Sequence, residues 1–339
     1  MTSDSRLSSL VDPLRELLQD IQSLLSRTVE SREQIIAGFS CDFLPFEIVS
    51  AAGIFPYVIP EGEVPTTTDA IVVPAACRRF SEKNVSVPVI SVPLSATGYG
   101  EPALPQWEQI MVDCIERITG ARSRRPDPVV LAECTERYNS LRRLVRGIAS
   151  LRREKPSLLS NRDLQVVFDA ALCLPPDTVI NHLKAILDAL NTTEPSKPSQ
   201  GLPAMVYGSF SVNQELFDKL EDTGFLVVED DTCRGRRSFD MSHDTSSPDL
   251  YREILHAHSF RPFCPCMRGV TERFELLYRL AASYGIETVI LIDDDSCPAW
   301  KGQIGQMRVK LMRAGIDPLV VTPANAVETA RRYIELASL

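Results

Sequence analysis

The feature that most constrains the fold is an alternation of short apolar runs and amphipathic segments near the end of the chain. Apolar runs at residues 204–207, 225–228, 288–292 and 318–322 are separated by segments with helical apolar spacing. Strands that alternate with helices predict parallel pairing with right-handed crossovers, because each helix carries the chain back to the start of the next strand. We therefore expect an α/β domain over residues 201–339.

The preceding part of the chain predicts a second unit of the same kind. Residues 4–36 have helical periodicity, and three apolar runs after them predict strands, at residues 55–59, 70–73 and 87–92. From about residue 107 to 190 the spacing is helical, and a polar, proline-rich stretch follows. With 339 residues the chain is long enough for two cores. We expect two Rossmann-like parallel-sheet domains with an N-terminal helix and a helical connecting region, divided as 1–36, 37–106, 107–200 and 201–339.

Charge and hydropathy exclude some classes of partner. The net charge is −9 and the pI is about 5.1, which argues against nucleic acid because phosphate binding needs a basic face. No apolar stretch approaches the roughly 20 residues of a membrane span. The first residues lack a charged-then-apolar leader. We expect a protein of the cytoplasm that binds neither nucleic acid nor membranes.

The cysteines fall into two groups. There are nine, and a disulfide framework is not expected for an odd number in a reducing compartment. Cys114, Cys134 and Cys173 lie in helical runs and are expected to be buried core residues. The other six lie outside those runs: Cys41, Cys77, Cys233, Cys264, Cys266 and Cys297.

The position of this second group suggests a metal site. Cys77, Cys233 and Cys297 each follow an apolar strand closely, and ligands of parallel sheets bind beyond the carboxyl ends of strands. The loop with Cys264 and Cys266 is expected at the same edge. Thiolates suit iron–sulfur clusters, zinc or copper(I). Spacing alone leaves these metals and a purely structural role open.

Four sequence blocks, in order, resemble a known family. They are residues 38–56, which contain Cys41; residues 230–239; the motif Pro-Phe-Cys-Pro-Cys at 262–266; and residues 284–297. Together they resemble the 2-hydroxyacyl-CoA dehydratase / benzoyl-CoA reductase family, which includes the double-cubane cluster proteins. The similarity extends over nearly the whole chain from about residue 35.

This resemblance implies an enzyme of anaerobic metabolism, either an iron–sulfur oxidoreductase or a lyase. The cluster would lie between the two α/β domains. Low-potential electrons would come from a separate ATP-hydrolysing activator that carries its own iron–sulfur cluster, in agreement with the lack of a P-loop in this sequence. The resemblance also implies a homodimer or a heterodimer with a related chain.

The sequence departs from the family at several positions. A cysteine usual before the Cys77 strand has no counterpart, Arg78 replaces an aspartate, and Ser296 replaces a phenylalanine. Six cysteines remain, which would serve two cubanes with three ligands each. The hypothesis is a double-cubane cluster that reduces small molecules. The alternatives are a dehydratase or benzoyl-CoA reductase subunit with a single 4Fe-4S cluster, and a zinc-binding or structural subunit without redox activity.

Two charged residues are further candidates. Glu47 follows the Cys41 loop on a short predicted helix, where it could donate a proton near the cluster or provide the negative charge favoured at a helix start. Arg236, with two other arginines beside Cys233, could stabilise the negative charge of a cluster or bind a CoA phosphate. A solvated loop is the alternative for the arginines.

Overall fold

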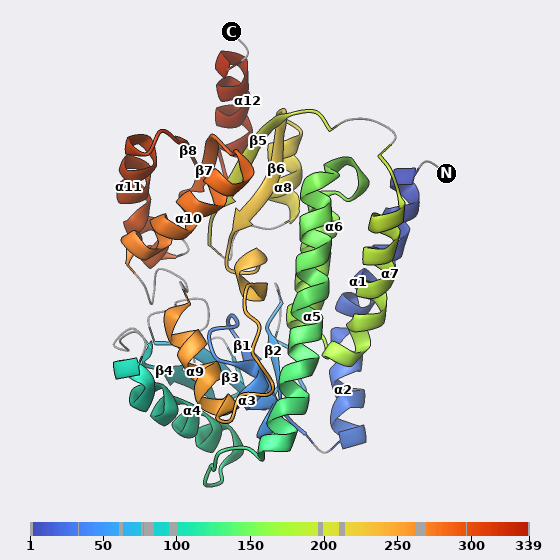
Figure 1. The fold of residues 1–339 in the computed structure, drawn as a ribbon, viewed down its shortest axis with the longest axis vertical. Helices are drawn as coiled ribbons and strands as arrows, with labels where there is room; N and C mark the ends of the chain where they lie inside the picture. The colour runs from blue at the N-terminus through green and yellow to red at the C-terminus, as the bar shows by residue number, and fades with distance from the viewer. Residues whose placement is uncertain are drawn as a thin grey trace.

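In the part of the chain that the structure describes, two four-stranded parallel sheets are surrounded by helices, which confirms the predicted fold class (Figure 1). A computed structural model of the chain describes residues 3–32, 34–60, 64–75, 77, 85–94, 101–195, 199–209, 214–261, 269–295 and 297–337. The first sheet lies in the lower half of Figure 1 and the second sheet in the upper half.

The first sheet has the strand order β2-β1-β3-β4. Its strands are β1 (Ile35–Phe39), β2 (Ile54–Val58), β3 (Ala70–Pro74) and β4 (Val89–Val92). Strand β1 was not predicted, because the helical spacing of the N-terminal segment extends through residue 36. That helical segment is α1 (Ser3–Gln19) followed by α2 (Ile21–Arg32). The run Ile-Ile-Ala-Gly-Phe then forms the strand, because pairing on both edges with β2 and β3 buries four of its five residues.

The second sheet repeats this topology with the order β6-β5-β7-β8. Its strands are β5 (Leu202–Tyr207), β6 (Phe225–Asp231), β7 (Thr288–Ile292) and β8 (Asp317–Val321), all at predicted positions. Helices α8 (Gln214–Glu221) and α12 (Ala326–Ala337) contribute to the core on one face, and α10 (Val270–Tyr284) and α11 (Pro298–Arg313) to the core on the other. In both sheets the chain order reverses between the first and third strands, so each has a topological switch point there.

A long helix, α5 (Pro128–Glu154), runs beside both sheets (Figure 1). Its start is capped by Asp127, whose side chain accepts hydrogen bonds from two backbone amides of the first turn. Near its other end, the buried side chain of Arg152 donates to the carbonyl oxygen of Val227 in β6. The helix therefore contacts elements of both domains.

The remaining helices complete the first core. They are α3 (Phe46–Ala51), α4 (Leu104–Thr119), α6 (Asn161–Cys173), α7 (Pro176–Thr192) and α9 (Leu250–Phe260). Although α9 follows β6 in sequence, its residues Leu250, Ile254 and Leu255 belong to the first core. The boundary at residue 200 stays a prediction, and the packing shows that a later segment returns to the first domain.

Within the part of the chain that the structure describes, no helix is long and apolar enough to cross a membrane.

Candidate functional site at the facing strand ends

Four of the six candidate cysteines follow the carboxyl ends of strands. Cys41 follows β1, Cys77 follows β3, Cys233 follows β6 and Cys297 follows β7. Cys297 packs against the first core and also against the core between β7 and α11. The carboxyl ends of β1 and β7 are therefore linked by contacts across one interface. The remaining two candidates, Cys264 and Cys266, lie outside the described residues.

The burial of the cysteines separates the two groups. The four at the strand ends are partly exposed, whereas Cys114, Cys134 and Cys173 are buried in helices, which confirms their predicted core positions. Burial raises the pKa of the Cys114 thiol to about 12 and also raises that of Cys134. A thiol ligand must ionise and be reached by the metal, so the partly exposed group is better suited to ligation.

As donors, these thiols suit an iron–sulfur cluster. Among the described residues, no three His, Cys, Asp or Glu side chains come together as a metal-binding group. The four described cysteines thus match a cluster by donor type and by their place after strand ends, and the described residues alone do not assemble its ligand set.

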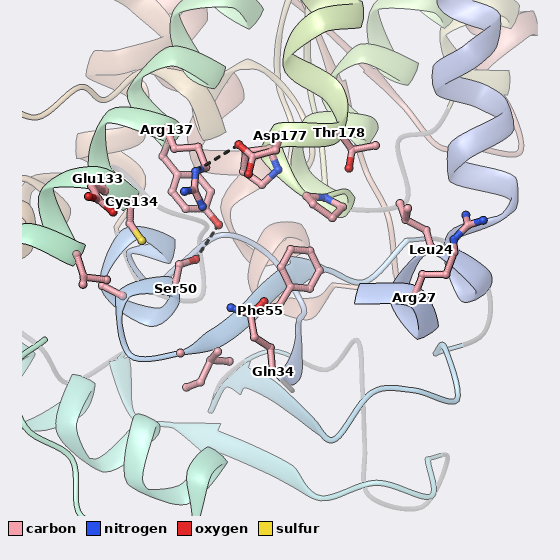
Figure 2. A pocket seen from close by; sticks show the side chains of 17 residues that line it. Leu24, Arg27, Gln34, Ser50, Phe55, Glu133, Cys134, Arg137, Asp177 and Thr178 are labelled. Atoms are coloured by element: carbon pink, nitrogen blue, oxygen red, sulfur yellow. Dashed lines mark hydrogen bonds and ion pairs between the residues drawn. The ribbon is translucent and has the colours of Figure 1, made fainter. Parts of the chain in front are cut away.

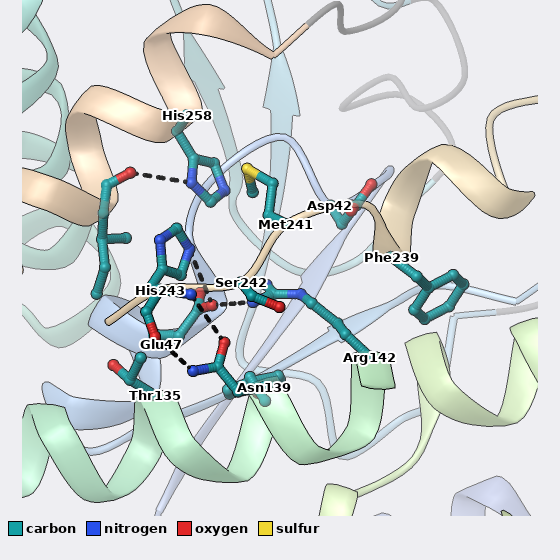
Figure 3. Close-up of polar contacts among 12 residues, drawn as sticks. Asp42, Glu47, Thr135, Asn139, Arg142, Phe239, Met241, Ser242, His243 and His258 are labelled. Carbon is teal, nitrogen blue, oxygen red and sulfur yellow. Dashed lines mark hydrogen bonds and ion pairs between the residues drawn. The ribbon is translucent and has the colours of Figure 1, made fainter. Parts of the chain in front are cut away.

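Glu47 lies in a buried group of charged and polar side chains with Arg142 and His243 (Figure 3). Its Oε1 atom accepts a hydrogen bond from the guanidinium of Arg142, and the Nε2 atom of His243 lies 3.6 Å from it. Asn139 on α5 holds the backbone of His243. Its side chain donates to the carbonyl oxygen of His243 at 2.7 Å and accepts from the His243 amide at 3.0 Å. The ring of His243 stacks on that of His258 with a centroid separation of 6.1 Å.

The charged side chains around Glu47 keep it ionised. Burial alone would raise its pKa, but the nearby charges of Arg142 and His243 lower it to about 2. Burial lowers the pKa of His243, and that of His258 well below the usual value. At neutral pH the geometry therefore favours a fixed negative charge for Glu47 over the role of proton donor.

Arg236 lies beside the acidic end of β6. Its guanidinium contacts Glu229 at 3.3 Å and Asp240 at 3.3 Å. Glu229 also accepts from Arg153 at 2.8 Å. Burial raises the pKa of Glu229 to about 7, despite these two cations. Arg236 is therefore already engaged by two carboxylates, and any bound phosphate would have to compete with them.

The loop that carries Cys233 is folded tightly against β6. Burial raises the pKa of Asp230 to about 6, and its Oδ1 atom accepts from the Thr232 hydroxyl at 2.8 Å. A Cβ atom added to Gly235 would lie 1.5 Å from that same oxygen. A side chain at this position would displace the Asp230 carboxylate, and glycine lets the loop cross directly over it.

Sequence reasoning missed the side chains that connect these loops. Asp42 accepts hydrogen bonds from Arg261 and Ser238, although both lie far away in sequence. Their positions in the sequence could have indicated this role, since Asp42 follows Cys41 directly and Arg261 precedes Cys264 by three residues. Charged residues next to candidate ligands are common partners of metal-binding loops.

A separate pocket lies near the amino end of β2 (Figure 2). Its volume is about 430 Å³, within the range of small-molecule sites. An ion pair between Arg137 and Asp177 at 3.3 Å and a hydrogen bond between Ser50 and Tyr138 at 3.1 Å lie in its wall. None of the four candidate cysteines that the structure describes lines it, so it is distinct from the strand ends that lead to them.

Comparison with known proteins identifies the family. The family model described as 2-hydroxyglutaryl-CoA dehydratase, D-component, matches residues 64–323, a span that begins after Cys41 and Glu47 and contains the other five candidate cysteines. No curated protein matches the chain. A solved structure described as a complex of SsGBP and GDP is 10% identical, covers 90% of this chain and 98% of its own, and has a TM-score of 0.25, which is too low to support an argument. The chain belongs to the 2-hydroxyglutaryl-CoA dehydratase D-component family, which confirms the resemblance found in the sequence.

Proposed function

We propose that this chain is the iron–sulfur component of an enzyme that acts on a small acyl-CoA or related molecule under anaerobic conditions. Members of its family are dehydratases, which supports an enzyme of the lyase type. The observation that supports an iron–sulfur cluster is the placement of Cys41, Cys77, Cys233 and Cys297 after strand ends at the domain interface.

The six candidate cysteines would hold the cluster, with Cys264 and Cys266 completing the described four. Such a cluster supplies single electrons at low potential. The cysteine count favours a double-cubane cluster over a single 4Fe-4S cluster, because six thiolates provide three for each cubane. Around it, Glu47 and Arg142 would provide a fixed pair of charges. Arg236 would offer positive charge to a cluster or a CoA phosphate by exchanging one of its carboxylate partners.

The proposal includes two partners. A separate activator would supply electrons and hydrolyse ATP, because this sequence contains no P-loop. A second copy or a related chain would complete the enzyme as a dimer, and the compartment would be the cytoplasm.

Iron analysis of anaerobically purified protein tests this proposal. A double-cubane cluster predicts about eight irons and a similar amount of acid-labile sulfide per chain, with an EPR signal after reduction, whereas a single cluster predicts about four. Cys297→Ala should lower the iron content. The matched control Cys114→Ala, at a buried cysteine on α4, should leave it unchanged. Protein without iron, or with zinc in its place, would overturn the redox function.

A further inference from the structure

The carboxylate of Asp42 links the first domain to two segments of the second half of the chain. It follows Cys41 directly, and both of its oxygen atoms are used. Oδ2 accepts from the guanidinium of Arg261 at 2.6 Å, and Oδ1 accepts from the hydroxyl of Ser238 at 3.0 Å. Arg261 also donates to the backbone carbonyl of Asp42 at 3.0 Å. A single residue is thus fixed by three hydrogen bonds from distant parts of the sequence.

Each of these partners belongs to a segment that carries candidate cysteines. Arg261 directly follows α9 and lies three residues before Cys264. Ser238 lies five residues after Cys233, in a short 3₁₀ helix over Arg236–Phe239. The Asp42 side chain therefore joins the loop of Cys41 to the loop of Cys233 and to the chain that leads into Cys264 and Cys266.

The connection continues into the second sheet. Arg261 donates to the carbonyl oxygen of Arg237 at 2.8 Å, and the Arg237 guanidinium donates to Asp231 at 3.2 Å. Asp231 ends β6 and also accepts from Arg273, which donates to the Tyr207 hydroxyl at 3.0 Å. The first-domain loop is thereby tied to the ends of both β5 and β6.

The pair between Asp42 and Arg261 lies in a largely water-excluded place. The exposed fractions of the two side chains are 14% and 6%. Charge-assisted hydrogen bonds in such surroundings have strong directional preferences, and removing one partner leaves the other charge buried. The pair therefore fixes the relative position of the loops more firmly than an exposed ion pair would.

We infer that Asp42 is a positioning residue that fixes the loop of Cys41, the loop of Cys233 and the carboxyl end of α9 relative to one another. The inference rests on the proposed function, because it concerns the same six cysteines. It assigns to Asp42 a role that acts through its neighbours, without contact to a metal.

The test measures how firmly the purified full-length protein retains iron. Asp42→Asn removes the charge and keeps the size of the side chain. A ferrous-iron chelator should strip iron from this variant about 10-fold faster or more than from the wild type, as for other residues that orient metal ligands. The EPR spectrum of the reduced variant should also change. Ser238→Ala, which keeps the ion pair with Arg261, should give a smaller acceleration and provides a second test if Asp42→Asn fails to fold.

Asp163→Asn is a closely matched control. The carboxylate of Asp163 also accepts from an arginine and a serine, Arg15 and Ser8, and it joins α1 to α6 away from the candidate ligands. It should lower the unfolding temperature without changing the chelation rate or the EPR spectrum.

These measurements distinguish the positioning role of Asp42 from the proposed iron–sulfur function of the chain. Equal chelation rates and spectra for Asp42→Asn and Asp163→Asn, in a wild type that binds iron, would overturn the positioning role and leave the proposed function standing. A wild type that binds no iron would overturn both.

Discussion

The first sheet and the second sheet have the same strand order, but the carboxyl ends of their strands carry different chemistry. In the first, the strands that flank the switch point lead to Cys41 and Cys77, and the buried carboxylate of Glu47 pairs with Arg142. In the second, β6 ends in three successive carboxylates, Glu229 to Asp231, of which the first and the third each pair with two arginines. The shared topology positions the loops, and the loop residues determine the charge.

The pKa values of the buried carboxyls show the consequence. Burial by itself would raise the pKa of Glu47, Glu229 and Asp230. At Glu47 the neighbouring Arg142 and His243 reverse this effect and lower the pKa to about 2. At the end of β6 burial prevails, so the pKa of Glu229 rises to about 7 and that of Asp230 to about 6. The two strand ends should therefore respond to pH in opposite directions.

The largest expected effect comes from breaking the ion pair of the first domain. Arg142→Ala would leave the carboxylate of Glu47 buried without its main cation, which should lower the free energy of unfolding by about 3–5 kcal/mol. Urea denaturation at neutral pH measures this change. The size of the loss would show how far the first strand end depends on a single pair.

Arg143→Ala, one residue further along α5, is the control for this substitution. Its ion pair with Glu136 is exposed on both sides, so its removal should cost less than about 1 kcal/mol. Similar losses for the two variants would contradict the view that burial gives the Glu47 pair its importance.

The second prediction concerns the pH dependence of the second domain. Glu229 has a raised pKa in the folded state, so between its unfolded value of 4.5 and about 7 the folded protein holds a proton that the unfolded chain has lost. Stability from this group is thus present at low pH and is lost as pH rises to about 7. Glu229→Gln removes that loss. As the pH rises from 5 to 8, the free energy of unfolding of the variant should increase by about 2–3 kcal/mol relative to that of the wild type.

Unfolding curves across this pH range provide the measurement, and Glu215→Gln on α8 is the control. Glu215 is exposed and its pKa is lowered by Lys219, so its titration lies below the range in question. If Glu229→Gln and the control show the same pH dependence as the wild type, Glu229 is ionised throughout and the contrast between the strand ends does not hold.

Local sequence patterns predicted the second sheet well and the first sheet less completely. All four strands of the second sheet follow apolar runs between polar segments, whereas β1 directly follows a helical segment and was merged with it. That error placed Cys41 in an opening loop, when it follows a central strand of the sheet. The contact between Asp42 and Arg261 joins residues 219 positions apart, and no local pattern carries such information. The return of α9 to the first core was missed for the same reason.

The smallest expected effect tests why the Cys233 loop needs glycine. In Gly235→Ala the new Cβ would meet the Asp230 carboxylate, which is held by Thr232 and cannot turn away freely, so the variant should be about 1–3 kcal/mol less stable than the wild type. Gly302→Ala on α11 meets no atom within 4 Å and should be neutral or slightly stabilising, because alanine favours a helix. Thermal unfolding of both variants measures the difference. A Gly235→Ala protein as stable as the wild type would mean that Asp230 can move, and the loop would then owe its position to Asp42 and Ser238 across the domain interface.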